Sequence, residues 1–211
     1  DNQWRHYSRA YLYLAALAAP LVLSVHSVVS WDFASSLIPG WHGTIFAPYF
    51  VAGAIYSGVG MVFTLLIPLR KHLKLEHMIG DYHFDNMSKL TLFTGTILFY
   101  AYGMEYFVAW YSGNTFEQMT FWRRAFGPMW WGGWAMIICN GLVSQLLWFR
   151  RIRINLTALF VISIFINIGM WFERYVIINS LANDYVPYAW DNMVPTWADW
   201  GVLAGSFGWF G

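Results

Sequence analysis

The 211-residue sequence predicts an all-α protein, a polytopic bundle of transmembrane helices. Hydrophobic residues make up 58% of the chain and charged residues only 11%, less than half of the share found in soluble domains. Aromatic residues reach 21%, with 14 Trp and 13 Tyr, a composition typical of the two interfaces of a bilayer. Apolar stretches of about 20 residues, the length that crosses the hydrocarbon core as a helix, recur along the chain.

Five stretches predict full spans, and a sixth span begins near the end of the sequence. They cover residues 11–37, 44–69, 88–111, 128–149 and 155–181, with a partial span from residue 200. Helix breakers fall between them, as at Ile38-Pro39-Gly40 and Ser112-Gly113-Asn114. We expect residues 1–211 to form a single transmembrane domain that is a fragment of a longer protein.

The basic residues predict the orientation of the spans. Nine of the 12 Lys and Arg residues precede the first span or lie between spans two and three or four and five; they are Arg5, Arg9, Arg70, Lys71, Lys74, Lys89, Arg150, Arg151 and Arg153. Because basic residues are enriched in cytoplasmic loops, these segments are predicted to be cytoplasmic. The opposite loops, which carry Glu117, Asp184, Asp191 and Asp199, would then face outward.

Ionisable residues inside predicted spans are candidates for function, because burying charge in a membrane is costly. Such residues are His26, Asp32, Glu105, Glu173 and Arg174; His42 and Glu117 occupy predicted outer loops. Measured along each helix, all of them fall toward the outer side of the bilayer. A structural interpretation also exists for each: Asp32 and His42 as interfacial residues, Glu173 and Arg174 as an ion pair, and His26 or Glu105 as a partner of a neighbouring helix.

His26 and Asp32 are six residues apart, so they lie about 120° apart around an ideal helix. They would line adjacent walls of one pocket rather than share a face. The cytoplasmic half carries neutral polar residues, which favour hydrogen bonds between helices and could also hold water chains. They are Thr91, Thr94, Thr96, Asn140, Ser144, Gln145 and Asn167.

The residue inventory excludes several kinds of redox chemistry within the chain. Only His26 of the six histidines lies in a span, so paired axial ligands for a haem are not available, and the one cysteine, Cys139, cannot hold an iron–sulfur cluster. No metal site and no basic patch for nucleic acid is predicted. A lipophilic quinol remains as a substrate, because an Asp or His beside aromatic rings can accept its two protons while its electrons leave to another subunit.

Several segments resemble the polysulfide-reductase-type (NrfD-like) membrane subunits, and among these the ActC subunits of bacterial alternative complex III. They are residues 24–34 (SVHSVVSWDFA), 39–42 (PGWH), 48–55 (PYFVAGAI), 111–114 (YSGN) with Glu117, 139–140 (CN), 167–174 (NIGMWFER) and 195–196 (PT). Subunits of this kind have eight to ten transmembrane helices, so the resemblance implies a fragment of a larger subunit in the bacterial inner membrane.

The resemblance implies quinol, or menaquinol, oxidation on the periplasmic side, without a metal or haem in this chain. Asp32 and His26 would be the catalytic residues, with Asp32 as proton acceptor, and His42 would join them in binding quinol. Glu105, Glu117, Glu173 and Arg174 would serve proton exit or site structure. Implied partners are a periplasmic iron–sulfur subunit, multihaem cytochrome c subunits with c-type haem, a second NrfD-like membrane subunit and lipids. Proton translocation through the polar residues is left open.

Three alternatives compete with a quinol-oxidising subunit. A membrane anchor of a quinone-linked reductase would use the same pocket in the reverse direction. A proton or ion transporter would use the same carboxylates, although transporters place charge near the midplane. A purely structural anchor would not need the buried charges, so replacing Asp32 by Asn distinguishes it from an oxidoreductase subunit.

Overall fold

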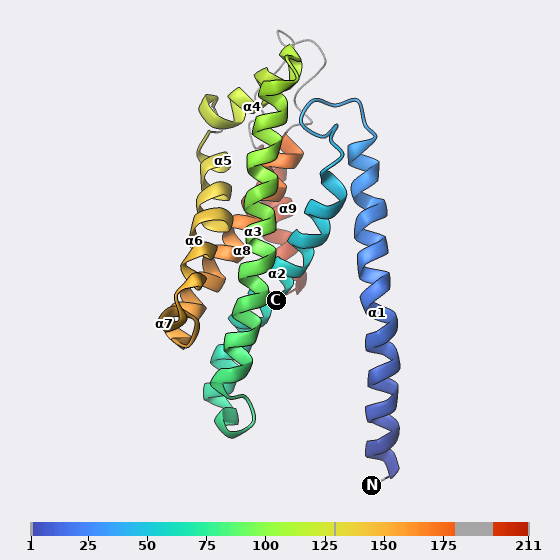
Figure 1. Ribbon diagram of the computed structural model, residues 1–211, viewed down its shortest axis with the longest axis vertical. Helices are drawn as coiled ribbons and strands as arrows, with labels where there is room; N and C mark the ends of the chain where they lie inside the picture. The colour runs from blue at the N-terminus through green and yellow to red at the C-terminus, as the bar shows by residue number, and fades with distance from the viewer. Residues whose placement is uncertain (1, 129, 180–195, 211) are drawn as a thin grey trace.

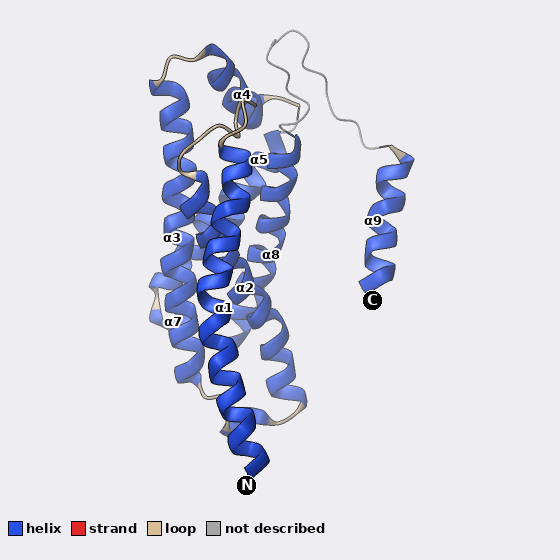
Figure 2. Cartoon of the chain, turned by 90° about the vertical axis from the view of Figure 1, so that its right-hand side faces the viewer, coloured by secondary structure: helices blue, strands red, loops and turns tan. Residues whose placement is uncertain are grey.

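Helices form all the regular secondary structure of the residues that the computed structural model describes, which are 2–128, 130–179 and 196–210. The all-α prediction is therefore confirmed for this part of the chain, which folds as a helical membrane bundle (Figure 1, Figure 2). The long helices are α1 (Asn2–Ala34), α2 (Phe46–His72), α3 (Asp81–Tyr111) and α8 (Leu156–Asn179). The shorter ones are η1 (Leu75–His77), α4 (Thr115–Phe126), α5 (Trp130–Met136), η2 (Ile137–Leu142), α6 (Val143–Gln145), η3 (Leu146–Trp148), α7 (Arg150–Arg153) and α9 (Trp197–Phe210).

Among the described helices, α1, α2 and α8 are long and apolar enough to cross a membrane as single helices. The third predicted span is the 31-residue helix α3, whose threonines, tyrosines and Glu105 make it less apolar. The predicted start of the sixth span corresponds to α9, where Asp199 accepts hydrogen bonds from the backbone N–H and hydroxyl of Thr196 and so caps the first turn. The predicted end of the fifth span, residue 181, lies outside the described residues.

The fourth predicted span is a succession of helical types rather than one α-helix. A π-helical segment, η2, separates α5 from α6, and a 3-10 turn, η3, ends the span. A π-helix places one extra residue in a turn, and such segments often occur at functional sites. Here it contains Asn140, which is fully buried, and Cys139, a buried free thiol.

Helix α4 corrects one expectation, because Glu117 lies in a helix and not in an outer loop. Gly113, with a φ of +67°, allows the tight turn after α3, and the Asn114 side chain accepts a hydrogen bond from the Phe116 N–H at 3.0 Å. The helix ends at Phe126, and Gly127 caps its C-terminus. It lies across one end of α3, at the top of Figure 1. Residues Glu117 and Arg124 are therefore held on a rigid element.

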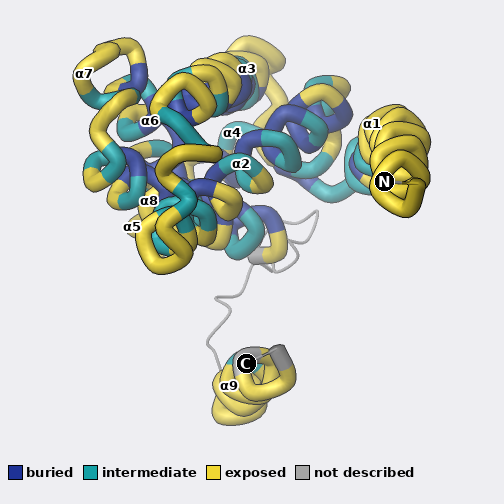
Figure 3. Tube along the Cα trace, turned by 90° about the horizontal axis from the view of Figure 1, so that it is seen from below, coloured by how far each residue is buried: buried dark blue, intermediate teal, exposed yellow. Residues whose placement is uncertain are grey.

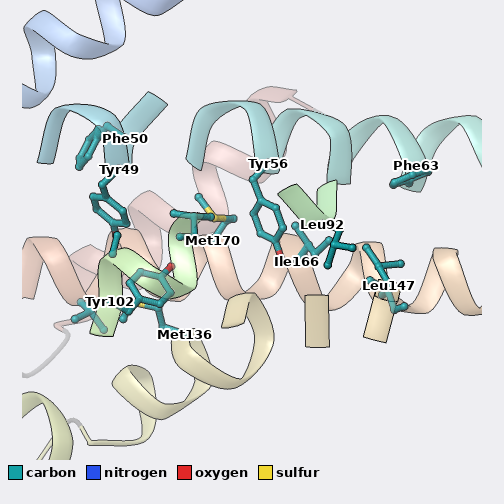
Figure 4. Packing of buried hydrophobic residues seen from close by; sticks show 14 of the residues in the cluster. Tyr49, Phe50, Tyr56, Phe63, Leu92, Tyr102, Met136, Leu147, Ile166 and Met170 are labelled. Carbon is teal, nitrogen blue, oxygen red and sulfur yellow. The ribbon is translucent and has the colours of Figure 1, made fainter. Parts of the chain in front are cut away.

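The core lies between α2, α3, α8 and the fourth span (Figure 4). Tyr56 and Phe63 of α2, Leu98 of α3 and Ile166 of α8 are each at most 1% exposed. Helix α1 differs, since Ser30 is the single buried residue within it and most of its surface is exposed (Figure 3). It contacts the bundle through its last turns, where Phe33 stacks on Phe46 and Phe50.

The basic segments lie toward one end of the bundle, away from α4 (Figure 1). There Asp85 of α3 pairs with Lys89 at 2.6 Å and with Arg153 of α7 at 2.8 Å. The hydrogen bonds from these two cations lower the pKa of Asp85 to about 2. Arg153 also donates to the carbonyls of Leu147 and Trp148, so one side chain fixes the end of the fourth span to α3.

Glycines allow the closest contacts between helices, as is usual in membranes. A methyl group at Gly60 of α2 would lie 2.7 Å from Ile166 Cγ2 of α8. A methyl group at Gly169 of α8 would lie 2.6 Å from the Cys139 Cβ and would collide with the Asn140 Oδ1. Helix α8 thus packs directly against the π-helical segment.

We expect Gly169→Ala to destabilise the bundle by about 1–3 kcal/mol, the usual cost of overpacking a filled core. The apparent midpoint of thermal unfolding of the protein in detergent measures the effect. Gly58→Ala is the matched control, because a methyl group at Gly58 of α2 meets no atom within 4 Å. Equal midpoints for the two variants would contradict the close packing of α8 on η2.

Candidate functional site

A cavity of about 420 Å³ opens at the end of the bundle where α4 lies. Its walls come from the loop between α1 and α2, the first turn of α2, the last turns of α3, and α4; they include Gly40, His42, Phe46, Glu105, Val108, Glu117 and Phe121. Two carboxylates and one imidazole therefore line a mostly apolar space, together with the neutral polar residues Thr44, Ser112 and Asn114. The volume is within the range of small-molecule sites, which combine apolar walls with a few polar groups.

Three of the residues predicted from the sequence are brought together in this cavity: Glu105, Glu117 and His42. Glu105, from α3, interacts electrostatically with Arg124, Glu173 and Glu117. Glu117, from α4, is partly desolvated, which raises the pKa of its carboxyl group. A hydrogen bond from the Gly40 N–H and the charge of Arg124 oppose this rise. Both carboxylates are placed to accept a proton from a molecule in the cavity.

The loop between α1 and α2 presents His42 to the cavity. The His42 Nδ1 lies 3.1 Å from the carbonyl oxygen of Ser36. Because a carbonyl oxygen can only accept, Nδ1 carries the proton and Nε2 of the neutral ring is left as an acceptor. His42 is exposed, so this acceptor is accessible at the mouth of the cavity. A neighbouring cavity of about 290 Å³, beside the end of α1, also includes His42.

Glu173 is the most deeply buried ionisable side chain of the predicted site, at 1% exposure. Its Oε2 accepts a hydrogen bond of 2.5 Å from the hydroxyl of Tyr102, and Tyr49 hydrogen-bonds to the same carboxyl group. The Tyr102 oxygen in turn accepts from the Asn140 Nδ2 at 3.0 Å. Figure 4 shows Tyr49 and Tyr102 directed toward each other, with ring centroids 5.8 Å apart.

Arg174 forms an ion pair with Glu173, since its Nη1 lies 3.7 Å from the Glu173 Oε1. Its guanidinium group also lies over the ring of Phe50, 4.6 Å from the centroid. The ion pair between Glu173 and Arg174, which the sequence offers as the structural role of these residues, is thus present in the fold. The additional contacts of Glu173 with two tyrosines show that the carboxyl group belongs to a larger network.

His26 and Asp32 lie on α1, apart from the walls of the 420 Å³ cavity. His26 is half-buried, and its Nδ1 lies 2.8 Å from the carbonyl oxygen of Val22 in its own helix. The same tautomer argument leaves its Nε2 as an acceptor. Asp32 is exposed on the surface of α1. The different environments of the two residues agree with the 120° separation expected from their spacing.

Two groups of neutral polar residues lie inside the bundle. In the first, the Tyr56 hydroxyl and the Ser144 hydroxyl both donate to the Asn140 carbonyl oxygen, at 3.2 and 2.7 Å. In the second, Thr64 of α2 donates to Ser163 at 2.9 Å and accepts from Asn167 at 2.8 Å. Both groups join different helices by hydrogen bonds, the role predicted from the sequence, and they include Asn140 and Asn167. Thr91, Thr94 and Thr96 instead donate to carbonyl oxygens of their own helix, and Gln145 accepts from Trp148 in the same span.

Sequence reasoning missed Tyr102, Tyr49 and Arg124 as parts of the site. Tyrosines are numerous in this chain, and nothing in the pattern of α3 separates the buried Tyr102 from the exposed Tyr100. Arg124 is one of the three basic residues outside the segments predicted to be cytoplasmic. The signal for it was its spacing of seven from Glu117, which places both on one face of a helix.

Taken together, the fold and the cavity define a multi-pass helical membrane protein with an acid-lined site at one end of its bundle. The chain belongs to the polysulphide reductase NrfD family, whose sequence model matches residues 2–182. The match includes all the site residues discussed above and ends before Pro195. A search of curated proteins found no match. The family identifies the chain as a membrane subunit of quinone-linked redox complexes, whose members typically partner with iron–sulfur subunits.

Proposed function

We propose that this chain is the quinol-binding subunit of a quinol-oxidising electron-transfer complex, and that the quinol head group occupies the cavity between α3, α4 and the loop before α2. The observation that carries the proposal is that Glu105, Glu117 and His42 line one mostly apolar cavity of about 420 Å³. Family membership supports it, because this family works with quinones.

Oxidation of a quinol releases two electrons and two protons, and the residues of this chain would take the protons. The Nε2 of His42 and the carboxylate of Glu105 are acceptors that face the same space. Glu117 lies closer to the outer end, on α4, and would pass protons to the aqueous side. Phe46, Val108 and Phe121 supply apolar walls for the ring.

The electrons would pass to an iron–sulfur subunit bound at the same end of the bundle, which we propose to be periplasmic from the distribution of basic residues. Multihaem cytochrome c subunits would accept them next, and a second NrfD-like subunit would complete the membrane part, as in alternative complex III. In this proposal the inner membrane is the location, with the loops of Arg70, Lys71 and Lys74 and of Arg150, Arg151 and Arg153 on the cytoplasmic side.

The predicted pair on α1 remains part of the proposal as an alternative acceptor. The Nε2 of His26 is an acceptor, and Asp32 carries a carboxylate near the level of the second, smaller cavity, which is lined by Trp31 and Ala34. Proton translocation across the bundle would use the network of Glu173, Tyr102 and Asn140, which are joined by hydrogen bonds.

Photoaffinity labelling of the intact complex tests the position of the head group. An azido-quinone should label peptides that contain residues 40–46 and 104–121, and excess quinol should suppress that label. Label confined to residues 22–34 of α1 would instead place the head group beside His26 and Asp32. Label distributed along all helices, with no suppression by quinol, would contradict a quinol site in this chain.

A further inference from the structure

Side chains on one face of α4 contact the backbone of Gly40, which lies on the loop between α1 and α2. The Gly40 N–H donates to the Glu117 Oε2 at 3.0 Å, and the Gly40 carbonyl oxygen accepts from the Arg124 Nη2 at 3.3 Å. Thr120 completes this face, since a methyl group on Gly40 would lie 2.9 Å from its Cγ2. The three α4 residues follow the i, i+3, i+7 spacing of a single helical face.

Only glycine fits at position 40 in this arrangement. Its φ is +86°, in the left-handed region where other residues are strained. A methyl group there would also lie 2.7 Å from the Arg124 Nη2. Because Gly40 adopts this conformation and has no side chain, Glu117 and Arg124 of α4 can reach its backbone, two positions before His42.

A second contact fixes the other side of the same loop. The indole N–H of Trp41 donates to the carbonyl oxygen of Ile177 on α8 at 2.8 Å. The loop is thus tied to α8 by Trp41 and to α4 by Gly40, and His42 follows directly. Hydrogen bonds to charged groups are stronger than those between neutral groups, which gives the α4 side the larger influence on the loop.

We propose that Glu117 and Arg124 are positioning residues that clamp the backbone of Gly40, and thereby close the outer wall of the cavity and hold His42 at its mouth. This inference rests on the proposed function for its effect on quinol, but the clamp itself can be tested without quinol. In the clamp, the carboxylate of Glu117 accepts from the N–H of Gly40 and the guanidinium of Arg124 donates to the carbonyl oxygen of the same residue, so the two peptide units that flank Gly40 are both held. Loss of either contact would free the loop to move away from α4.

A cysteine at residue 43 reports on the clamp. Gly43 lines the cavity, and a methyl group there meets no atom within 4 Å, so Gly43→Cys should be accommodated. In the intact complex, a membrane-impermeant maleimide should label this cysteine slowly in the otherwise unchanged chain. Glu117→Ala and Arg124→Ala should each raise the labelling rate about ten- to a hundredfold, because each removes a hydrogen bond to a charged group.

Matched variants separate the clamp from a general loosening of α4. Glu117→Gln keeps an acceptor for the Gly40 N–H and should label at a rate close to the parent. Met119→Ala changes an exposed side chain of α4 and should also leave the rate unchanged. Unchanged labelling in both Glu117→Ala and Arg124→Ala would overturn the clamp. An equal rise in Met119→Ala would also overturn it, because the effect would then belong to the whole helix.

Quinol kinetics of the same complexes test the link to the site. In Arg124→Ala, which releases the clamp, the KM for quinol should rise severalfold more than kcat falls. Glu117→Gln should keep the KM near the value of the parent, although its kcat should fall because the amide cannot pass protons to the aqueous side. Faster labelling with unchanged kinetics would confirm the clamp and refute its role in a quinol site. Altered kinetics without faster labelling would refute the clamp and leave the proposed function standing.

Discussion

Replacing Glu105 by Gln is expected to slow quinol oxidation by the intact complex about 10²- to 10⁴-fold, the usual contribution of a general base. Glu105 faces the cavity from α3, and it interacts electrostatically with Glu117 and with Arg124. The amide of Gln has nearly the same shape but cannot accept the proton of a quinol hydroxyl group. We expect the effect mainly on kcat, because the head group still fits the cavity.

Steady-state oxidation of a water-soluble quinol analogue, coupled to reduction of an artificial acceptor, measures this prediction. Glu76→Gln is the control, since Glu76 is an exposed acid in η1, at the other end of the bundle. The turnover of the Asp32→Asn and His26→Ala variants is measured in the same assay. Normal turnover in Glu105→Gln together with loss of turnover in Asp32→Asn would move the proton acceptor from the cavity to α1. Normal turnover in all of these variants would favour a structural anchor or a transporter.

Most of the helices could be predicted because the length of an apolar stretch and the position of breakers are local properties. The predicted range 44–69 became α2, Phe46–His72, and the range 88–111 lies inside α3. Helix α4 was missed although Asn114 and Gly127 mark its two ends. Its mixed polar and apolar residues do not have the continuous apolar pattern of a transmembrane span. The π-helical turn leaves no comparable mark in the sequence.

The site could be predicted only in part. The depth of a residue along its helix follows from the local sequence, but the neighbours that its side chain faces depend on how the helices pack together. Glu105, Glu117 and His42 were placed at the same end from spacing alone, and the structure shows that they share a cavity. Which helices pack together decides the partners of Glu173, and Tyr102 and Asn140 come from two different spans. No pattern within the segment 167–174 indicates either of them.

Replacing Tyr102 by Phe is expected to destabilise the bundle by about 2–5 kcal/mol. The hydroxyl of Tyr102 donates to Glu173 and accepts from Asn140, and all three side chains are buried. Without the hydroxyl, a carboxyl oxygen and an amide N–H lose a partner in a region that water does not reach. The apparent midpoint of thermal unfolding in detergent measures the loss. Tyr100→Phe is the control, because Tyr100 is 62% exposed on the same helix.

A double-mutant cycle with Glu173→Ala, which leaves no acceptor for the Tyr102 hydroxyl, shows whether the network acts as one unit. If it does, the two substitutions together should cost clearly less than the sum of the single effects, since each removes the same hydrogen bond. Strict additivity would mean that Tyr102 and Glu173 act independently, and it would contradict the 2.5 Å contact between them. Coupling in stability with unchanged quinol turnover would assign the network to the fold alone. Coupling in both quantities would place Glu173 on the route that protons take from the cavity.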